Sequence, residues 1–113
     1  MSDPERPGVR ASVDGERTVL DAERATIDRL RARIDALDDA LAATLRERAQ
    51  VARALGRSKR ALRRALRDEP REAAVRARAV ALLADLPADA VEAVWATVNA
   101  LCLEVQRRDD PGG

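Results

Sequence analysis

A long stretch without proline, from about Thr18 to Lys59, constrains the fold of this 113-residue chain most strongly. Its apolar residues recur at intervals of three and four, which places them on one face of an α-helix. A helix of this length would expose most of that face to water in a monomer, so the pattern predicts a partner helix. The predicted apolar stripe consists of Ile27, Leu30, Ile34, Leu37, Leu41, Leu45, Ala52 and Leu55.

The composition favours helices in the rest of the chain as well. The sequence has one Trp, no Phe and no Tyr, too little aromatic and β-branched content for a sheet. A second helix is predicted to start near Asp68–Pro70, where an acidic N-cap and a proline in the first turn are a normal helix entry, and to close at Leu86-Pro87. A third is predicted from about Ala88 to Arg107. The predicted fold class is all-α, with one long helix and two shorter ones.

The predicted helical domain spans residues 18–108. Residues 1–17 contain two prolines and two glycines among scattered charges and are predicted to be a disordered tail, as are residues 109–113. Residues 57–67 hold six basic residues and no acidic one, which predicts a mobile connection or a frayed end of the long helix. Three helices in this order bury too little surface for a stable monomer, so we expect an intertwined homodimer.

Charge and composition argue against several classes of partner. The formal net charge is +1, so no global field favours nucleic acid or a membrane surface. No run of about 18 apolar residues is present, so neither a membrane-spanning segment nor a membrane partner is expected. No apolar run follows the first charges, so no signal peptide is expected. The single Cys cannot form an internal disulfide, which favours a cytoplasmic location.

The sequence contains no histidine. This removes the Ser–His and Cys–His arrangements of nucleophilic catalysis and argues against a zinc site. We therefore expect no metal and no cofactor. An enzyme of this composition has to work with Arg, Lys, carboxylates and amides.

Arg48 lies on the apolar face of the predicted long helix, seven residues after Leu41 and seven before Leu55. An arginine there can bury its stem and keep its head in water, or it can face a cavity that holds an anion. Lys59 favours the second interpretation, because eleven residues place it only about 20° around the helix from Arg48. Arg31 is about 42 Å from Lys59 along a straight helix, so it can approach this region only from the second chain of an antiparallel pair.

Further polar residues follow in the shorter helices. Cys102 and Gln106 are one turn apart on the inward face of the third helix. Cys102 can equally be a small core residue, and Gln106 can be solvated near a frayed helix end. Asp68, Arg71 and Glu72 can be no more than a capped, charged first turn. Spacing alone leaves these alternatives open.

Taken together, these residues resemble those of the all-α (AroQ-type) chorismate mutases. The resemblance covers roughly residues 27–107, and its parts occur in the family's order and with its spacing. It consists of Leu30-Arg31-x-x-Ile34-Asp35-x-Leu37-Asp38-x-x-Leu41, then Glu47-Arg48, Gly56 and Lys59, then Asp68-x-x-Arg71-Glu72, and finally Trp95, Cys102 and Gln106.

The resemblance implies an isomerase that converts chorismate to prephenate in the cytoplasm, as part of the shikimate pathway and aromatic amino acid biosynthesis. The substrate, chorismate, is a small molecule. Arg48 of one subunit and Arg31 of the other would bind its carboxylates, and Arg71 would add a further cation. Lys59 and Gln106 would donate hydrogen bonds to the ether oxygen.

The resemblance also assigns the acidic residues and the cysteine. Asp68 and Glu72 would accept a hydrogen bond from the ring hydroxyl. Cys102 departs from the family, which often has Ser at this position as a donor to a carboxylate; a thiol donates only weakly.

Other functions are also compatible with the sequence. A 4-amino-4-deoxychorismate mutase or an isochorismate-pyruvate lyase of the same fold would use similar residues, since Asp68 and Glu72 could also receive an amine. A non-enzymatic helical dimerisation module would explain the long helix but not the joint spacing of the cations and Gln106. Nucleic-acid binding through residues 57–67 is disfavoured by the lack of aromatic side chains for stacking.

Overall fold

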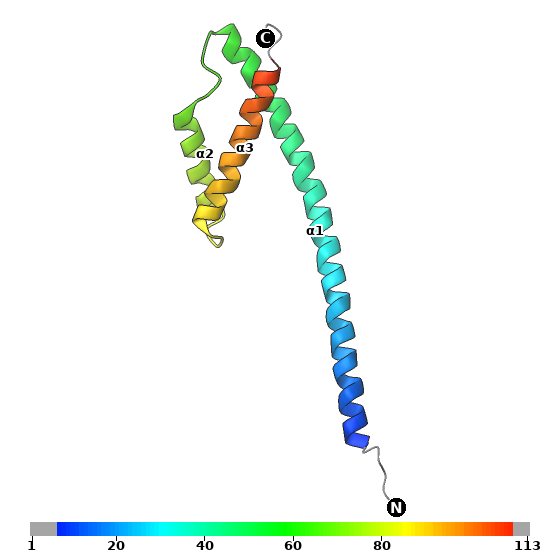
Figure 1. Cartoon of the computed structure of the whole chain (residues 1–113). Coiled ribbons are helices and arrows are strands. Elements are labelled where there is room, and N and C mark those ends of the chain that lie inside the picture. The colour runs from blue at the N-terminus through cyan, green and yellow to red at the C-terminus, as the bar shows by residue number, and fades with distance from the viewer. Residues whose placement is uncertain (1–6, 110–113) are drawn as a thin grey trace, which may run out of the picture. The chain divides into compact units, whose positions relative to one another are not determined.

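The computed structural model describes residues 7–109, which form three helices and no strand (Figure 1). These are α1 (Pro7–Ala61), α2 (Glu69–Leu82) and α3 (Ala88–Arg108). The predicted all-α class is confirmed. None of the described helices contains an apolar stretch long enough to span a lipid bilayer.

The chain divides into two compact units, residues 1–41 and residues 42–113. The first unit consists of the N-terminal part of α1. The second contains the remainder of α1 together with α2 and α3, which pack against each other as an antiparallel pair joined by a short turn (Figure 1). All the tertiary structure described below lies within the second unit.

Helix α1 begins at Pro7, eleven residues before the predicted start at Thr18. Residues 7–17, expected to belong to a disordered tail, are therefore helical. Pro7 fits the first turn, where its missing N–H has no helical partner to lose. No further proline occurs in α1, and once a helix has nucleated each added residue gains a hydrogen bond. Residues 1–6 and 110–113 of the predicted tails lie outside the described residues.

The basic segment 57–67 is part helix and part turn. Helix α1 ends at Ala61, and Arg63 adopts a left-handed conformation with φ 56°. The Arg63 N–H donates to the Arg60 carbonyl at 2.9 Å and the Arg64 N–H to the Lys59 carbonyl at 2.7 Å. This pair of bonds is a Schellman motif, which satisfies the last carbonyls of a helix and usually has glycine at the left-handed position.

The start of α2 follows the sequence prediction. Asp68 is the N-cap, and its Oδ1 accepts a hydrogen bond from the Arg71 N–H at 3.0 Å, with Pro70 in the first turn. The helix ends at Leu82, four residues before the predicted Leu86-Pro87. Leu82, the last residue before the turn to α3, is 71% exposed.

The described part of a single chain has a small core. Its buried apolar residues are Ala52, Ala79, Val91 and Cys102, and no large side chain is fully buried. The apolar stripe of α1 is uncovered instead: Leu30 is 59% and Leu41 58% exposed. A surface of this kind marks an interaction site in a folded protein.

Replacing Arg63 with glycine should stabilise the chain. A residue with a Cβ is penalised in the left-handed region, whereas glycine is not. We expect Arg63→Gly to raise the free energy of unfolding by about 0.5–1 kcal/mol, measured by urea denaturation. Arg63→Ala is the matched control, since it removes the same charge but keeps the Cβ. An equal gain in both variants would show that charge, not backbone conformation, is responsible.

Candidate active site

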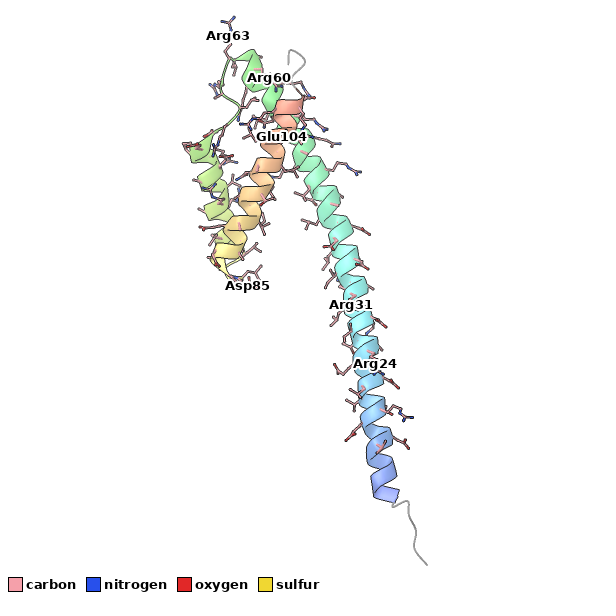
Figure 2. The ribbon with its side chains drawn as sticks, in the orientation of Figure 1. Arg24, Arg31, Arg60, Arg63, Asp85 and Glu104 are labelled. Atoms are coloured by element: carbon pink, nitrogen blue, oxygen red, sulfur yellow. The ribbon has the colours of Figure 1, made fainter. Side chains whose placement is uncertain are left out.

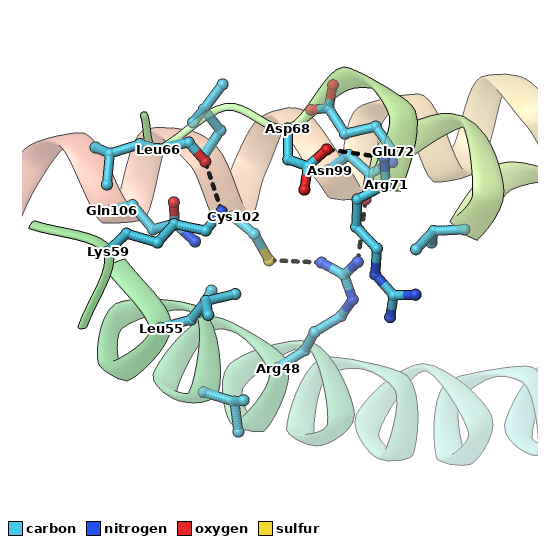
Figure 3. A pocket seen from close by; sticks show the side chains of 14 residues that line it. Arg48, Leu55, Lys59, Leu66, Asp68, Arg71, Glu72, Asn99, Cys102 and Gln106 are labelled. Atoms are coloured by element: carbon cyan, nitrogen blue, oxygen red, sulfur yellow. Dashed lines mark hydrogen bonds between the residues drawn. The ribbon is translucent and has the colours of Figure 1, made fainter. Parts of the chain in front are cut away.

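A cavity of about 270 Å³ lies in the second unit, lined by residues of α1, the 62–68 connection, α2 and α3 (Figure 3). This volume is near the lower end of the range for small-molecule sites. Apolar walls come from residues such as Leu55, Leu66 and Leu103. Seven of the eight residues predicted from the sequence line the same cavity: Arg48, Lys59, Asp68, Arg71, Glu72, Cys102 and Gln106.

Arg48 is partly buried, and its guanidinium is held by α3. One terminal nitrogen donates to Cys102 Sγ at 2.9 Å and the other to Asn99 Oδ1 at 3.0 Å. The alternative in which its head simply extends into water is therefore wrong. A guanidinium has five N–H donors, so these two bonds fix its plane and leave further donors for an anion in the cavity.

Cys102 is buried and acts here as a hydrogen-bond acceptor. The guanidinium has no acceptor atom, so the direction of the bond is fixed by chemistry. The sulfur therefore holds a cation of the site in place. This differs from the donor function that the family often assigns to a serine at the same position.

Lys59 is half-buried and lies on the same face of α1 as Arg48, as its spacing predicted. Its Nζ donates to the Leu66 carbonyl at 2.8 Å, which ties the connection after α1 to the site. An ammonium has three N–H donors. Two of them are left for a ligand oxygen.

Gln106 is buried, with 6% of its surface exposed, so solvation at a frayed helix end is wrong. Its backbone carbonyl accepts a hydrogen bond from Arg60, and its side-chain Oε1 has no partner among the described residues. A methyl group at Gly56 would lie 3.0 Å from Gln106 Cγ and 3.3 Å from its Cβ. The glycine therefore marks close packing, and it permits α3 to approach α1.

The acidic residues lie at the start of α2. Asp68 is both the helix cap and a lining residue. Glu72 accepts from Arg67 Nε at 3.3 Å. Three cations (Arg48, Lys59 and Arg71) thus face two carboxylates around the cavity. Partial compensation of this kind lowers the cost of burying cations together while leaving an excess of positive charge for an anion.

Arg31 does not line this cavity. It belongs to the first unit and is exposed (Figure 2). A single chain therefore brings together seven of the predicted residues but not the eighth.

The family of the chain follows from comparison with known proteins. A model of the family described as chorismate mutase type II matches residues 30–107, more than two thirds of the chain. The chain belongs to this family. It is an isomerase that converts chorismate to prephenate. No curated protein and no solved structure matches the sequence significantly.

The residues that line the cavity suit a chorismate mutase. Its reaction is an intramolecular rearrangement, in which one C–O bond breaks while one C–C bond forms. It requires no nucleophile and no proton shuttle, so a chain without histidine can catalyse it. What it does require is that a dianion be held in a reactive conformation, and three cations on two helices, α1 and α2, can do this.

Asn99 also lines the cavity of the mutase and was not predicted from the sequence. It precedes Cys102 by three residues and Gln106 by seven, so all three share one face of α3. That spacing was a usable signal. The sequence prediction missed Asn99 because it considered only Cys102 and Gln106 as polar residues of this face.

Gly56→Ala should impair the mutase more than it destabilises it. Alanine favours the helix by about 1 kcal/mol, which offsets the crowding, but the new methyl group displaces the Gln106 side chain. We expect kcat/KM for chorismate to fall roughly tenfold, because small displacements at a reacting centre are costly. Gly15→Ala, in the same helix with no neighbour within 4 Å, should leave activity unchanged. Equal activity of the two variants would contradict this function of Gly56.

Proposed function

We propose that this chorismate mutase binds chorismate in the cavity, holds the enolpyruvyl side chain over the ring, and stabilises the negative charge that develops on the ether oxygen. The observation that supports this most directly is the convergence of seven predicted residues, from three helices and a connection, on one cavity. Restraint of the reactive conformer and stabilisation of developing charge are the two contributions that such a reaction needs.

The carboxylates of the substrate are assigned to the arginines. Arg48 is already fixed in orientation by α3, and Arg71 faces the same space (Figure 3). A guanidinium fork binds a carboxylate through two parallel hydrogen bonds, which fixes direction as well as distance.

The ether oxygen is assigned to Lys59 and Gln106. Lys59 has two N–H donors beyond the one used on the Leu66 carbonyl, and the buried amide of Gln106 provides a neutral donor. Donors aimed at this oxygen act on the transition state more than on the ground state, because the oxygen becomes negative only as the bond breaks. The ring hydroxyl is assigned to Asp68 and Glu72.

The active unit is proposed to be a homodimer in which each site receives Arg31 from the partner. The exposed α1 stripe and the small core of a single chain support this. With Arg31, each site would contain four cations and two carboxylates. The excess of two positive charges would balance the charge of a dianionic substrate. We also propose that the reaction serves aromatic amino acid biosynthesis; the cytoplasmic location stays a prediction.

The test of the site is turnover of chorismate by the purified protein, followed through loss of substrate and formation of prephenate. Arg48→Ala, Lys59→Ala and Gln106→Ala should each lower kcat/KM by at least about 10²-fold. Arg78→Ala removes an exposed arginine that does not line the cavity and serves as the control. No turnover by the wild-type chain would overturn the proposal. Faster turnover of 4-amino-4-deoxychorismate or isochorismate would reassign the substrate.

The shared site is tested by mixing two inactive variants, Arg31→Ala and Arg48→Ala, under conditions that exchange subunits. A mixed dimer has one site with both arginines and one with neither. Random mixing makes half of the dimers mixed, so recovery of about a quarter of the wild-type activity is expected. A mixture no more active than its components would show that Arg31 does not act across the dimer.

A further inference from the structure

One polar side chain in the cavity has an amide nitrogen with no function in the assignments above. We infer that Asn99 is a substrate-binding residue: its Oδ1 holds the Arg48 guanidinium, and its Nδ2 donates a hydrogen bond to the carboxylate that Arg48 binds. This inference rests on the proposed function, since it concerns the same substrate in the same site.

The orientation of the Asn99 amide follows from the chemistry of its neighbour. The oxygen and nitrogen of an amide are assigned from the hydrogen bonds around them. Arg48 can only donate, and it lies 3.0 Å from the amide atom that faces it, so that atom must be Oδ1. The Nδ2 group is consequently not used on Arg48.

The Nδ2 group is buried and has no hydrogen-bond partner among the described residues. A buried N–H without an acceptor is costly and calls for an explanation. The nearby guanidinium is positioned to hold an anion, and a carboxylate oxygen is the strongest type of acceptor for an amide N–H. A carboxylate bound to Arg48 would therefore satisfy both groups.

Asn99 also supplies what Cys102 lacks. A thiol is a weak donor, and its sulfur is already used to accept from Arg48 at 2.9 Å. Asn99 lies one helical turn earlier on the same face, with an amide that donates well. The two residues thus fix the two terminal nitrogens of Arg48, and the asparagine alone adds a donor for the substrate.

The first test observes the amide directly. Asn99 is the only asparagine in the sequence, so protein labelled with ¹⁵N-asparagine gives one side-chain amide group in an NMR spectrum. Saturation with prephenate, a dianion that retains both carboxylates, should move one of its two proton resonances downfield and slow its exchange with water. Unchanged resonances at saturation, as judged by calorimetry, would overturn the inference.

The second test separates substrate binding from a purely structural function. Asn99→Leu should lower kcat/KM about 10- to 100-fold, mainly through KM, as expected for a lost hydrogen bond to a charged group. Asn99→Asp keeps an acceptor for Arg48 but replaces the donor with a negative charge. It should lose at least as much activity as Asn99→Leu. An Asn99→Asp variant with wild-type kcat/KM would show that Asn99 only holds Arg48, and would overturn the inference.

A rescue experiment tests whether Asn99 acts as a hydrogen-bond donor. In the Asn99→Leu background, Cys102→Ser restores a hydroxyl donor one turn away and should recover at least about fivefold in kcat/KM. Thr97→Ala, at an exposed position of α3, is the matched control. No recovery would contradict the donor function.

No turnover by the wild-type chain overturns the proposed function together with this inference, whereas normal wild-type turnover with fully active Asn99 variants overturns this inference alone.

Discussion

The close approach of α3 to α1 at Gly56 is the contact on which the rest of the site depends. Without a side chain at Gly56, Gln106 packs directly on the surface of α1. Arg60 holds the Gln106 carbonyl, and Arg57 forms an ion pair with Asp109 at 3.0 Å. The C-terminal end of α3 is thereby fixed against the end of α1, and the face of α3 that contains its polar residues is turned toward Arg48.

A site assembled in this way suits a reaction that needs positioning and no proton transfer. Two of the three cations are held by atoms that contribute no competing negative charge: a sulfur and an amide oxygen for Arg48, and a backbone carbonyl for Lys59. Neutral acceptors orient a cation without neutralising it, so its field remains available for the substrate. The carboxylates of Asp68 and Glu72 lie on the α2 side of the cavity, where Asp68 also caps the helix.

Much of this arrangement could be predicted from the sequence because helical spacing determines direction. Eleven residues place Lys59 on the face of Arg48, and an acidic residue before a proline identifies Asp68 as a cap. The predicted start of α1 was wrong. The glycines and charges before Thr18 suggested a disordered tail, but the helix extends through these residues from Pro7. The Arg48 contacts with Asn99 and Cys102 could not be predicted, since they depend on how α3 packs on α1.

The bond from Lys59 to the Leu66 carbonyl has a consequence for how sequences of this kind can change in length. The connection from α1 to α2 has a site residue at each end, Lys59 before it and Asp68 after it, and Lys59 is also bonded to its interior. An insertion or deletion there would alter the distance between two groups that face the same cavity. The turn between α2 and α3, at residues 83–87, contributes nothing to the cavity lining. Natural length variation, and any inserted label or peptide, should therefore be accommodated at that turn.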